Sequence, residues 1–358
     1  MNTPLKCAAL LAAFFVVSLS FGDDRQFTEQ KIYDLEGLES LSLDFNHAEI
    51  EMTQNSGATL DITMIQTLKR GDKDSCLHVL SDERAGKALK VLTGYSSQRW
   101  TRNCNVHRTI KVLVGTAALQ RLALDHGHST LELQDIKMPN FELLARHSGV
   151  RVGAIVASMA SLDCRHGSLN IESAQSDNIR INGAHGKLKI AVLNSAEFEG
   201  SWRHGSVSLL KSQVGTVNFT SGHGAVYFDN HTGDTLNLSN RHGKIKANGL
   251  QLENVTLRNK HGPIVFSGGA SRLEAYNGHG AIKLVQTAAK FDIVSHNNHG
   301  NIKIQLPKGS QYNYAMNAKS VKINDKKLQA YHLKTQTQAT PNHIQINSSH
   351  GQVVIDEI

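Results

Sequence analysis

Apolar and polar residues alternate along most of the chain, and the alternation returns with a period of 19 residues. Three and five residues after a recurring histidine the side chains are apolar, as in Leu131 and Leu133 after His128. In several repeats a second apolar pair, such as Val217 and Phe219, precedes the next histidine. This alternation with a period of two is typical of strands that bury one face. The recurring histidines, with one repeat of 18 residues and one of 20 near the end, are His128, His147, His166, His185, His204, His223, His242, His261, His279 and His299.

The repeat predicts a stacked fold. Two short strands in 19 residues cannot bury their inner faces alone, but successive repeats can cover one another. We therefore predict an all-β fold, a single-stranded parallel β-helix (β-solenoid) with about 19 residues per coil over residues 116–305. The usual crossover preference favours a right-handed coil. A helical solenoid is excluded, because two helices do not fit into so short a repeat.

The segments on either side of the repeats are expected to close the solenoid. Residues 23–115 contain alternating stretches such as LESLSLDF and TLDITMIQ between polar turns, which predicts an N-terminal antiparallel β cap. Pro307 breaks the period, and residues 306–358 end with one more His-Gly strand pair at His350. Both segments would cover strand edges that are otherwise unpaired.

The first 22 residues have the pattern of a secretory signal peptide. Lys6 precedes an apolar stretch from Ala8 to Phe21, and small residues at Ser20 and Gly22 suit cleavage after Gly22. The stretch is short for a membrane span, although an uncleaved anchor is the alternative. No second long apolar run follows. We expect an exported protein in the periplasm, on the outer cell surface or secreted, without a transmembrane segment after cleavage.

The four cysteines have different settings. Cys7 belongs to the signal peptide, and Cys164 lies within the repeats, where it is expected to be a small buried residue. Cys76 and Cys104 flank a predicted hairpin and could form a disulfide in an oxidising compartment. The spacing of Cys76 and Cys104 in the sequence does not distinguish a disulfide from two free thiols. No cysteine has the context of a catalytic nucleophile.

Three stretches make the sequence resemble the putative-adhesin β-strand-repeat families of exported bacterial proteins, including the auto-transporter adhesin head (GIN) domains. They are LESLSLDFNHAEIEMTQNSGATLDITM, the recurring x-His-Gly-x-aliphatic-x-aliphatic phrase, and NIKIQLPKGSQYNYAMNAKS followed by IQINSSHGQVVI. The resemblance covers essentially the whole mature chain. It implies a β-helix in an envelope protein without established catalysis. The families more often have Ser or Gly where this chain has His.

The simplest interpretation of the recurring histidine is a turn that leads into a strand. Glycine after it can take a positive φ without steric cost, and histidine is among the residues that also enter the left-handed region. A functional interpretation is metal binding, because stacked imidazoles could supply ligands to Zn, Cu or Ni in a periplasmic protein. No carboxylate or thiolate shares the histidine column to complete such a site.

Cationic residues precede five of the histidines and support a third interpretation, an anion-binding edge. The formal charge of +7 falls to about +6 when Lys6 is removed with the signal peptide, and excess base favours anionic partners. A row of weak contacts would suit a linear anionic envelope polysaccharide through multiplicity. Crowded positive charge should also lower the histidine pKa values, so that binding strengthens at low pH. The five cationic residues are Arg146, Arg165, Arg203, Arg241 and Lys260.

An enzyme is a further possibility, after the binding and metal interpretations, because parallel β-helices also carry polysaccharide-active sites. Asp234 and Glu253 occupy equivalent positions of successive repeats, about one strand spacing apart, which is near the carboxylate separation of a retaining glycosidase. Arg272 follows at the next equivalent position, so an ion-pair ladder is the simpler explanation. Nucleotide-binding and nucleophile-elbow motifs are absent, and nucleic acid is not expected as a partner. We therefore expect a non-enzymatic protein without a cofactor, adhesin-like or structural.

Overall fold

The computed structural model describes residues 14–16, 25–95, 103–117, 119–328, 331–335 and 340–358. The expected signal peptide, residues 1–22, lies outside these ranges except for Phe14–Val16. The chain divides into two compact units, Met1–Leu169 and Asn170–Ile358, which we describe in turn. The one helix of the described residues, α1 (Lys73–Cys76), has four residues. No described helix has the length and apolarity needed to cross a bilayer.

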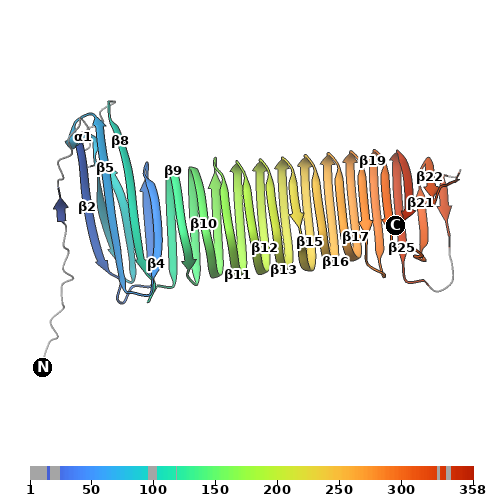
Figure 1. Cartoon of the computed structure of the whole chain (residues 1–358), viewed down its shortest axis with the longest axis horizontal. Helices are drawn as coiled ribbons and strands as arrows, with labels where there is room; N and C mark the ends of the chain where they lie inside the picture. Colours follow the sequence, from blue (N-terminus) through green and yellow to red (C-terminus); the bar gives the residue numbers. More distant parts are fainter. Residues whose placement is uncertain (1–13, 17–24, 96–102, 118, 329–330, 336–339) are drawn as a thin grey trace, which may run out of the picture. The chain divides into compact units, whose positions relative to one another are not determined.

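The described residues of unit 1 form ten strands, shown in blue to green in Figure 1. They are β1 (Phe14–Val16), β2 (Arg25–Asp34), β3 (Ser40–Asn46), β4 (Glu49–Asn55), β5 (Thr59–Arg70), β6 (His78–Ala85), β7 (Ala88–Tyr95), β8 (Asn105–Gly115), β9 (Arg121–Lys137) and β10 (Asn140–Arg165).

The solenoid of unit 1 begins earlier than the sequence suggests. β3 pairs in parallel with both β7 and β9, and β4 pairs in parallel with both β8 and β9. Residues 40–55 therefore form a coil, although the sequence placed them in an antiparallel section that extends to residue 115. Among the described strands of unit 1, antiparallel pairing is confined to the pairs β1 with β2, β2 with β5, β5 with β8, and β6 with β7.

A disulfide and a small satellite core stabilise the antiparallel part of unit 1. Cys76 and Cys104 are joined, with their Cα atoms 5.4 Å apart. Leu68 and Leu77 are buried beside Cys76, and Phe27 and Val106 pack against this cluster. Cys164 is a buried free thiol, and burial raises its pKa to about 12, so it is an inert core residue at neutral pH.

Unit 2 continues with stacked coils. Its strands are β11 (Leu169–His185), β12 (Leu188–His204), β13 (Val207–His223), β14 (Val226–Asp229), β15 (His231–His242), β16 (Ile245–His261), β17 (Ile264–His279), β18 (Ile282–Gln286), β19 (Asp292–His299), β20 (Ile302–Leu306), β21 (Asn313–Asn317), β22 (Ser320–Ile323), β23 (Lys326–Leu328), β24 (His332–Lys334), β25 (His343–His350) and β26 (Gln352–Glu357).

Parallel pairing with a 19-residue offset stacks these coils. Leu188 lies opposite Val207 and Phe198 opposite Val217, and β12 to β17 run side by side (Figure 1). The 18-residue repeat is absorbed at Gly249, where the register between β16 and β17 shifts. The predicted β-solenoid with coils about 19 residues apart is confirmed.

The C-terminal segment is inserted into the stack of unit 2. β25 pairs in parallel with β19 on one side and β21 on the other, and β26 lies likewise between β20 and β22. β24 and β23 then pair antiparallel with β21 and β22. The parallel stack is thus followed by short antiparallel hairpins, which cover its last backbone edge.

The apolar positions read from the repeat form the core. Three and five residues after the histidines, Val207, Leu209, Ile264 and Phe266 are fully buried, as are their equivalents along both units. The rings of Trp202 and Phe219 fit because the preceding coil has a glycine, Gly183 or Gly200, at the equivalent position. A Cβ at Gly183 would overlap the Trp202 ring. Strand alternation therefore buries one continuous apolar face within each unit.

The turn at the histidine differs between the units. In unit 1 the histidine itself is left-handed, with φ between 55° and 58° at His47, His128, His147 and His166. In unit 2 the following glycine takes the positive φ, between 110° and 152°. A Cβ at Gly205 would also overlap the carbonyl oxygen of Gly186 in the preceding coil. Glycine is therefore required there for conformation and for space.

The turn geometry predicts a large cost for Gly224→Ala. Gly224 has a φ of 120°, and its added Cβ would overlap the Gly205 carbonyl oxygen. We expect the free energy of unfolding to fall by at least about 2 kcal/mol in urea titrations. Gly149→Ala is the control, because the nearest atom to its Cβ would be Ser168 Oγ at 3.9 Å. Equal small effects of the two substitutions would contradict the proposed close packing of the turns.

Candidate functional site

The recurring histidines form parallel stacks of imidazole rings. In unit 1, ring centroids lie 4.6 Å apart from His47 to His128 and 4.8 Å apart from His128 to His147 and from His147 to His166, with planes within 4°. In unit 2 the stack runs from His185 to His299 and ends at His350. Its centroid spacings are between 4.5 and 5.0 Å, and its planes lie within 9°. His47 joins the row from outside the predicted repeats.

Backbone hydrogen bonds hold each turn of unit 2 in this register. The glycine N–H after one histidine donates to the carbonyl oxygen of the histidine in the next coil, as from Gly205 to His223 at 2.8 Å. Beneath the turn, the buried Asn259 side chain donates through Nδ2 to Gly243 O at 2.7 Å and Gly262 O at 3.1 Å. Asn277 and Asn297 bridge successive turns in the same way. The ring stack is therefore a consequence of a fixed backbone.

The stack geometry does not suit metal chelation. Equivalent atoms of two parallel rings stay as far apart as the rings, between 4.5 and 5.0 Å in unit 2. Two imidazole nitrogens bound to one Zn²⁺ lie at most about 4.2 Å apart, twice a metal–nitrogen distance of about 2.1 Å. Among the described residues, no group of three or more His, Cys, Asp and Glu could hold a metal ion.

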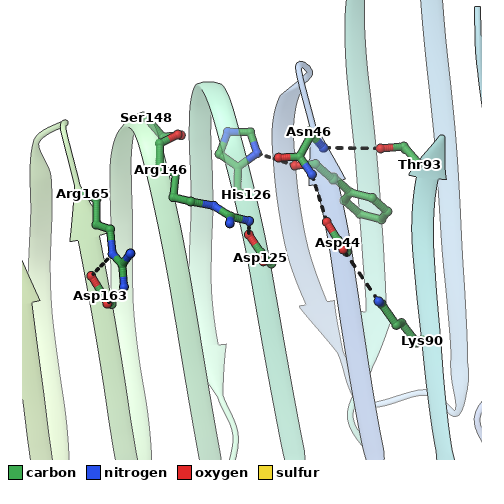
Figure 2. Close-up of polar contacts among 11 residues, drawn as sticks. Asp44, Asn46, Lys90, Thr93, Asp125, His126, Arg146, Ser148, Asp163 and Arg165 are labelled. Carbon is green, nitrogen blue, oxygen red and sulfur yellow. Dashed lines mark hydrogen bonds and ion pairs between the residues drawn. The ribbon is translucent and has the colours of Figure 1, made fainter. Parts of the chain in front are cut away.

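The two predicted site cations of unit 1, Arg146 and Arg165, both form ion pairs. Figure 2 shows Arg146 directed at Asp125 and Arg165 at Asp163, the second pair at 3.2 Å. His126, the residue after Asp125, is buried, and its Nδ1 lies 3.0 Å from Phe45 O. The sequence predicted both arginines as ligand-binding residues, and in the structure each is paired with an aspartate.

The three predicted site cations of unit 2 differ from Arg146 and Arg165. Arg203, Arg241 and Lys260 are exposed, and within the described part of the chain none of them forms an ion pair with a carboxylate. Gly222 lies between Arg203 and Arg241 in this row and has no side chain, and Lys260 follows Arg241 in the next coil. The result is an open hollow of about 650 Å³, which we call the turn groove.

The turn groove joins two further hollows on the same strands. Ser201 and Thr220 also line a neighbouring hollow of about 550 Å³, and Ser239 lines both of these and a third of about 450 Å³. No Asp or Glu is among the described residues that line the turn groove. The sequence identified its cations and the histidines His204 and His223, but it did not identify the hydroxyl row, because one Ser or Thr per strand is an ordinary surface residue.

Two histidines beside the turn groove have lowered pKa values. Partial desolvation, followed by the charges of His185 and His223, lowers the pKa of His204 below its ordinary value of 6.5. Desolvation and the neighbouring His223 and His261 lower the pKa of His242 in the same way, with further contributions from Arg241 and Lys260. Both rings are therefore neutral at pH 7 and gain charge on acidification.

The candidate catalytic carboxylates do not form a site with the turn groove. Asp234 and Glu253 are exposed and line none of the three hollows. Arg272 does not complete the expected ladder with them. It instead pairs with Glu274 at 2.8 Å and with Asp292 at 3.2 Å. The ion-pair ladder from Asp234 through Glu253 to Arg272 was therefore wrong, because the next carboxylates on the arginine's own strand and the following coil are nearer.

The lowered pKa values predict that unit 2 loses stability on acidification. An unfolded histidine binds its proton more strongly than folded His204 or His242, so stability present at neutral pH is lost as the pH falls through about 6.5. We expect urea midpoints to decrease between about pH 7.5 and pH 5.5, and to decrease less in H204Q/H242Q. The buried His231, whose pKa burial also lowers, should retain part of the effect in the variant. An unchanged pH dependence in the variant would contradict a contribution from the stack.

Comparison with known proteins gives low-identity structural matches. No curated protein sequence matches the chain. A putative adhesin from Bacteroides fragilis NCTC 9343 is 13% identical with a TM-score of 0.34, and the match covers 65% of this chain and 96% of that one. A putative lipid binding protein from Parabacteroides distasonis ATCC 8503 is 11% identical with a TM-score of 0.28, covering 92% and 96%. We draw no functional argument from likeness at this level.

A family model gives the stronger result. The model described as Toastrack DUF4097 matches residues 38–199 and again residues 194–356. The first match begins just before β3, in agreement with the coil formed by residues 40–55. The resemblance to exported β-repeat proteins noted in the sequence is thereby confirmed at the level of the family. Because the two matches together span most of the chain, this protein belongs to the Toastrack DUF4097 family.

Proposed function

We propose that this protein is an exported, non-enzymatic, adhesin-like binding protein, and that the turn groove of unit 2 binds anionic polysaccharide. The observation that carries the proposal is the group of three exposed cations, Arg203, Arg241 and Lys260, without carboxylate partners in the described chain and around a hollow without acidic lining. Export rests on the signal-like residues 1–22.

Charge and shape both support a polymeric ligand. The groove is open and spans several coils, so that many weak contacts can act together. Exposed ion pairs are individually weak, which makes a small anion a poor ligand and a linear polyanion a better one. Protonation of His204 and His242 would add positive charge beside the groove below neutral pH.

The other functions have less support. Metal binding would require the parallel imidazoles to leave their stack, and a polysaccharide-active enzyme would require reactive carboxylates close to the bound chain. The carboxylates beside the neighbouring hollows are instead paired, Glu199 with Arg180 and Glu274 with Arg272. Binding of an anion requires neither a rearrangement of the histidine stack nor a reactive carboxylate.

Removal of the three groove cations tests the proposal. We expect R203Q/R241Q/K260Q to bind polygalacturonate about tenfold more weakly at low salt, from three contacts of about 0.5 kcal/mol each. The matched control, K189Q/K211Q/K283Q, removes the same charge from exposed lysines of unit 2 that line none of the three hollows. Equal loss in the two variants, measured by calorimetry, would show a general charge effect and contradict a groove.

A further inference from the structure

A strip of neutral polar side chains lies beside the groove cations. In three successive coils of unit 2, at residues 216–222, 235–241 and 254–260, the outward side chains away from the turn are hydroxyls and amides, apart from Arg258 in the third coil. Asn237 donates through Nδ2 to Asn218 Oδ1 at 2.9 Å, which fixes two of the amides. No Asp or Glu occurs in these three segments. The strip can therefore lie close to an anionic ligand without repelling it.

A row of hydroxyls forms the part of the strip nearest the cations. Ser201, Thr220 and Ser239 occupy equivalent positions of successive strands, with Ser201 opposite Thr220 and Thr220 opposite Ser239. Ser201 Oγ donates to Asn182 Oδ1 at 2.7 Å. Thr220 and Ser239 have no hydrogen-bond partner for their hydroxyls within the described chain. Their donors and acceptors are free for a ligand.

An ordered guanidinium closes one end of the strip. The Arg258 guanidinium carbon lies 4.2 Å from the centroid of the Tyr276 ring, and Tyr276 stacks on His296 at 5.3 Å. Arg258 lines two of the three hollows. Because the aromatic ring holds the guanidinium in place, less conformational entropy is lost when it binds an anionic or hydroxyl group.

Two spacings define the ligand that fits. The cation row and the hydroxyl row are two residues apart along each strand, about 6.6 Å. Neighbouring coils repeat at the spacing of the histidine rings, between 4.5 and 5.0 Å. A uronic acid has its carboxylate and its vicinal hydroxyls on opposite edges of one pyranose ring, so that one sugar can present its carboxylate to the cation row and its hydroxyls to the hydroxyl row.

We propose that the turn groove takes a linear, uronic-acid-containing glycan that lies across successive coils, with carboxylates at Arg203, Arg241 and Lys260 and ring hydroxyls over Thr220 and Ser239. This inference rests on the anion binding proposed above and adds the class of sugar. A phosphate polymer of equal charge satisfies the cations but has no hydroxyls for the second row. The hydroxyl row therefore separates acidic glycans from other polyanions.

The test compares two probes, hexagalacturonate and linear hexaphosphate, on the full chain by calorimetry. We expect T220V/S239A to bind hexagalacturonate about tenfold more weakly, since two neutral hydrogen bonds are lost, and to bind hexaphosphate as the unmodified protein does. S208A/T232V is the control, because it removes two hydroxyls of unit 2 that line none of the hollows. Circular dichroism confirms that each variant is folded.

Each alternative outcome has a distinct meaning. If T220V/S239A binds both probes as the unmodified protein does, or loses both equally, the uronate inference is overturned while anion binding at the groove stands. If the R203Q/R241Q/K260Q variant retains full binding of hexagalacturonate, the groove is not the anion site and both proposals fail. If neither probe binds to the unmodified protein, both proposals are overturned.

Discussion

The close approach of backbone at the histidine turns is the constraint on which unit 2 depends. At the turns from Gly205 to Gly300, the glycine N–H donates to the histidine carbonyl of the next coil, and a Cβ on the glycine would overlap the carbonyl of the preceding turn glycine. This contact fixes the coil spacing at the turn. The imidazoles stack in consequence, and the residues that precede them are placed in straight rows. The backbone contact between turn glycines therefore determines how the side chains on the outer face are spaced.

Unit 1 reaches a similar arrangement by a different local solution. There the left-handed residue is the histidine itself, and His128 and His147 are followed by serine. Histidine enters the left-handed region more readily than β-branched residues, so it serves as a turn residue in these coils. In unit 2 the glycine after the histidine takes the positive φ, so the backbone does not require histidine there. The imidazole rings then form part of the outer surface beside Arg203, Arg241 and Lys260.

The sequence predicts the coil and its core well, because alternation and period report burial directly. Leu209, Phe219 and Phe266 were identified as inward residues from spacing alone, and they are buried. The coil of residues 40–55 was missed because its partners, β7 and β9, are remote in sequence and do not follow it at the 19-residue interval of the repeats. The site was predicted only in part. Spacing places Arg146 and Arg241 in one row, but it does not show that Asp125 neutralises the first.

Within unit 2, one backbone register places cations, hydroxyls and histidines in parallel rows on the outer surface. We propose that an acidic glycan lies along these rows. Amide NMR shifts of the labelled chain titrated with hexagalacturonate test this claim most directly. We predict saturable shifts concentrated in residues 199–204, 218–223, 237–242 and 256–261. Shifts centred on Arg146 and Arg165, or weak shifts spread over both units, would contradict it.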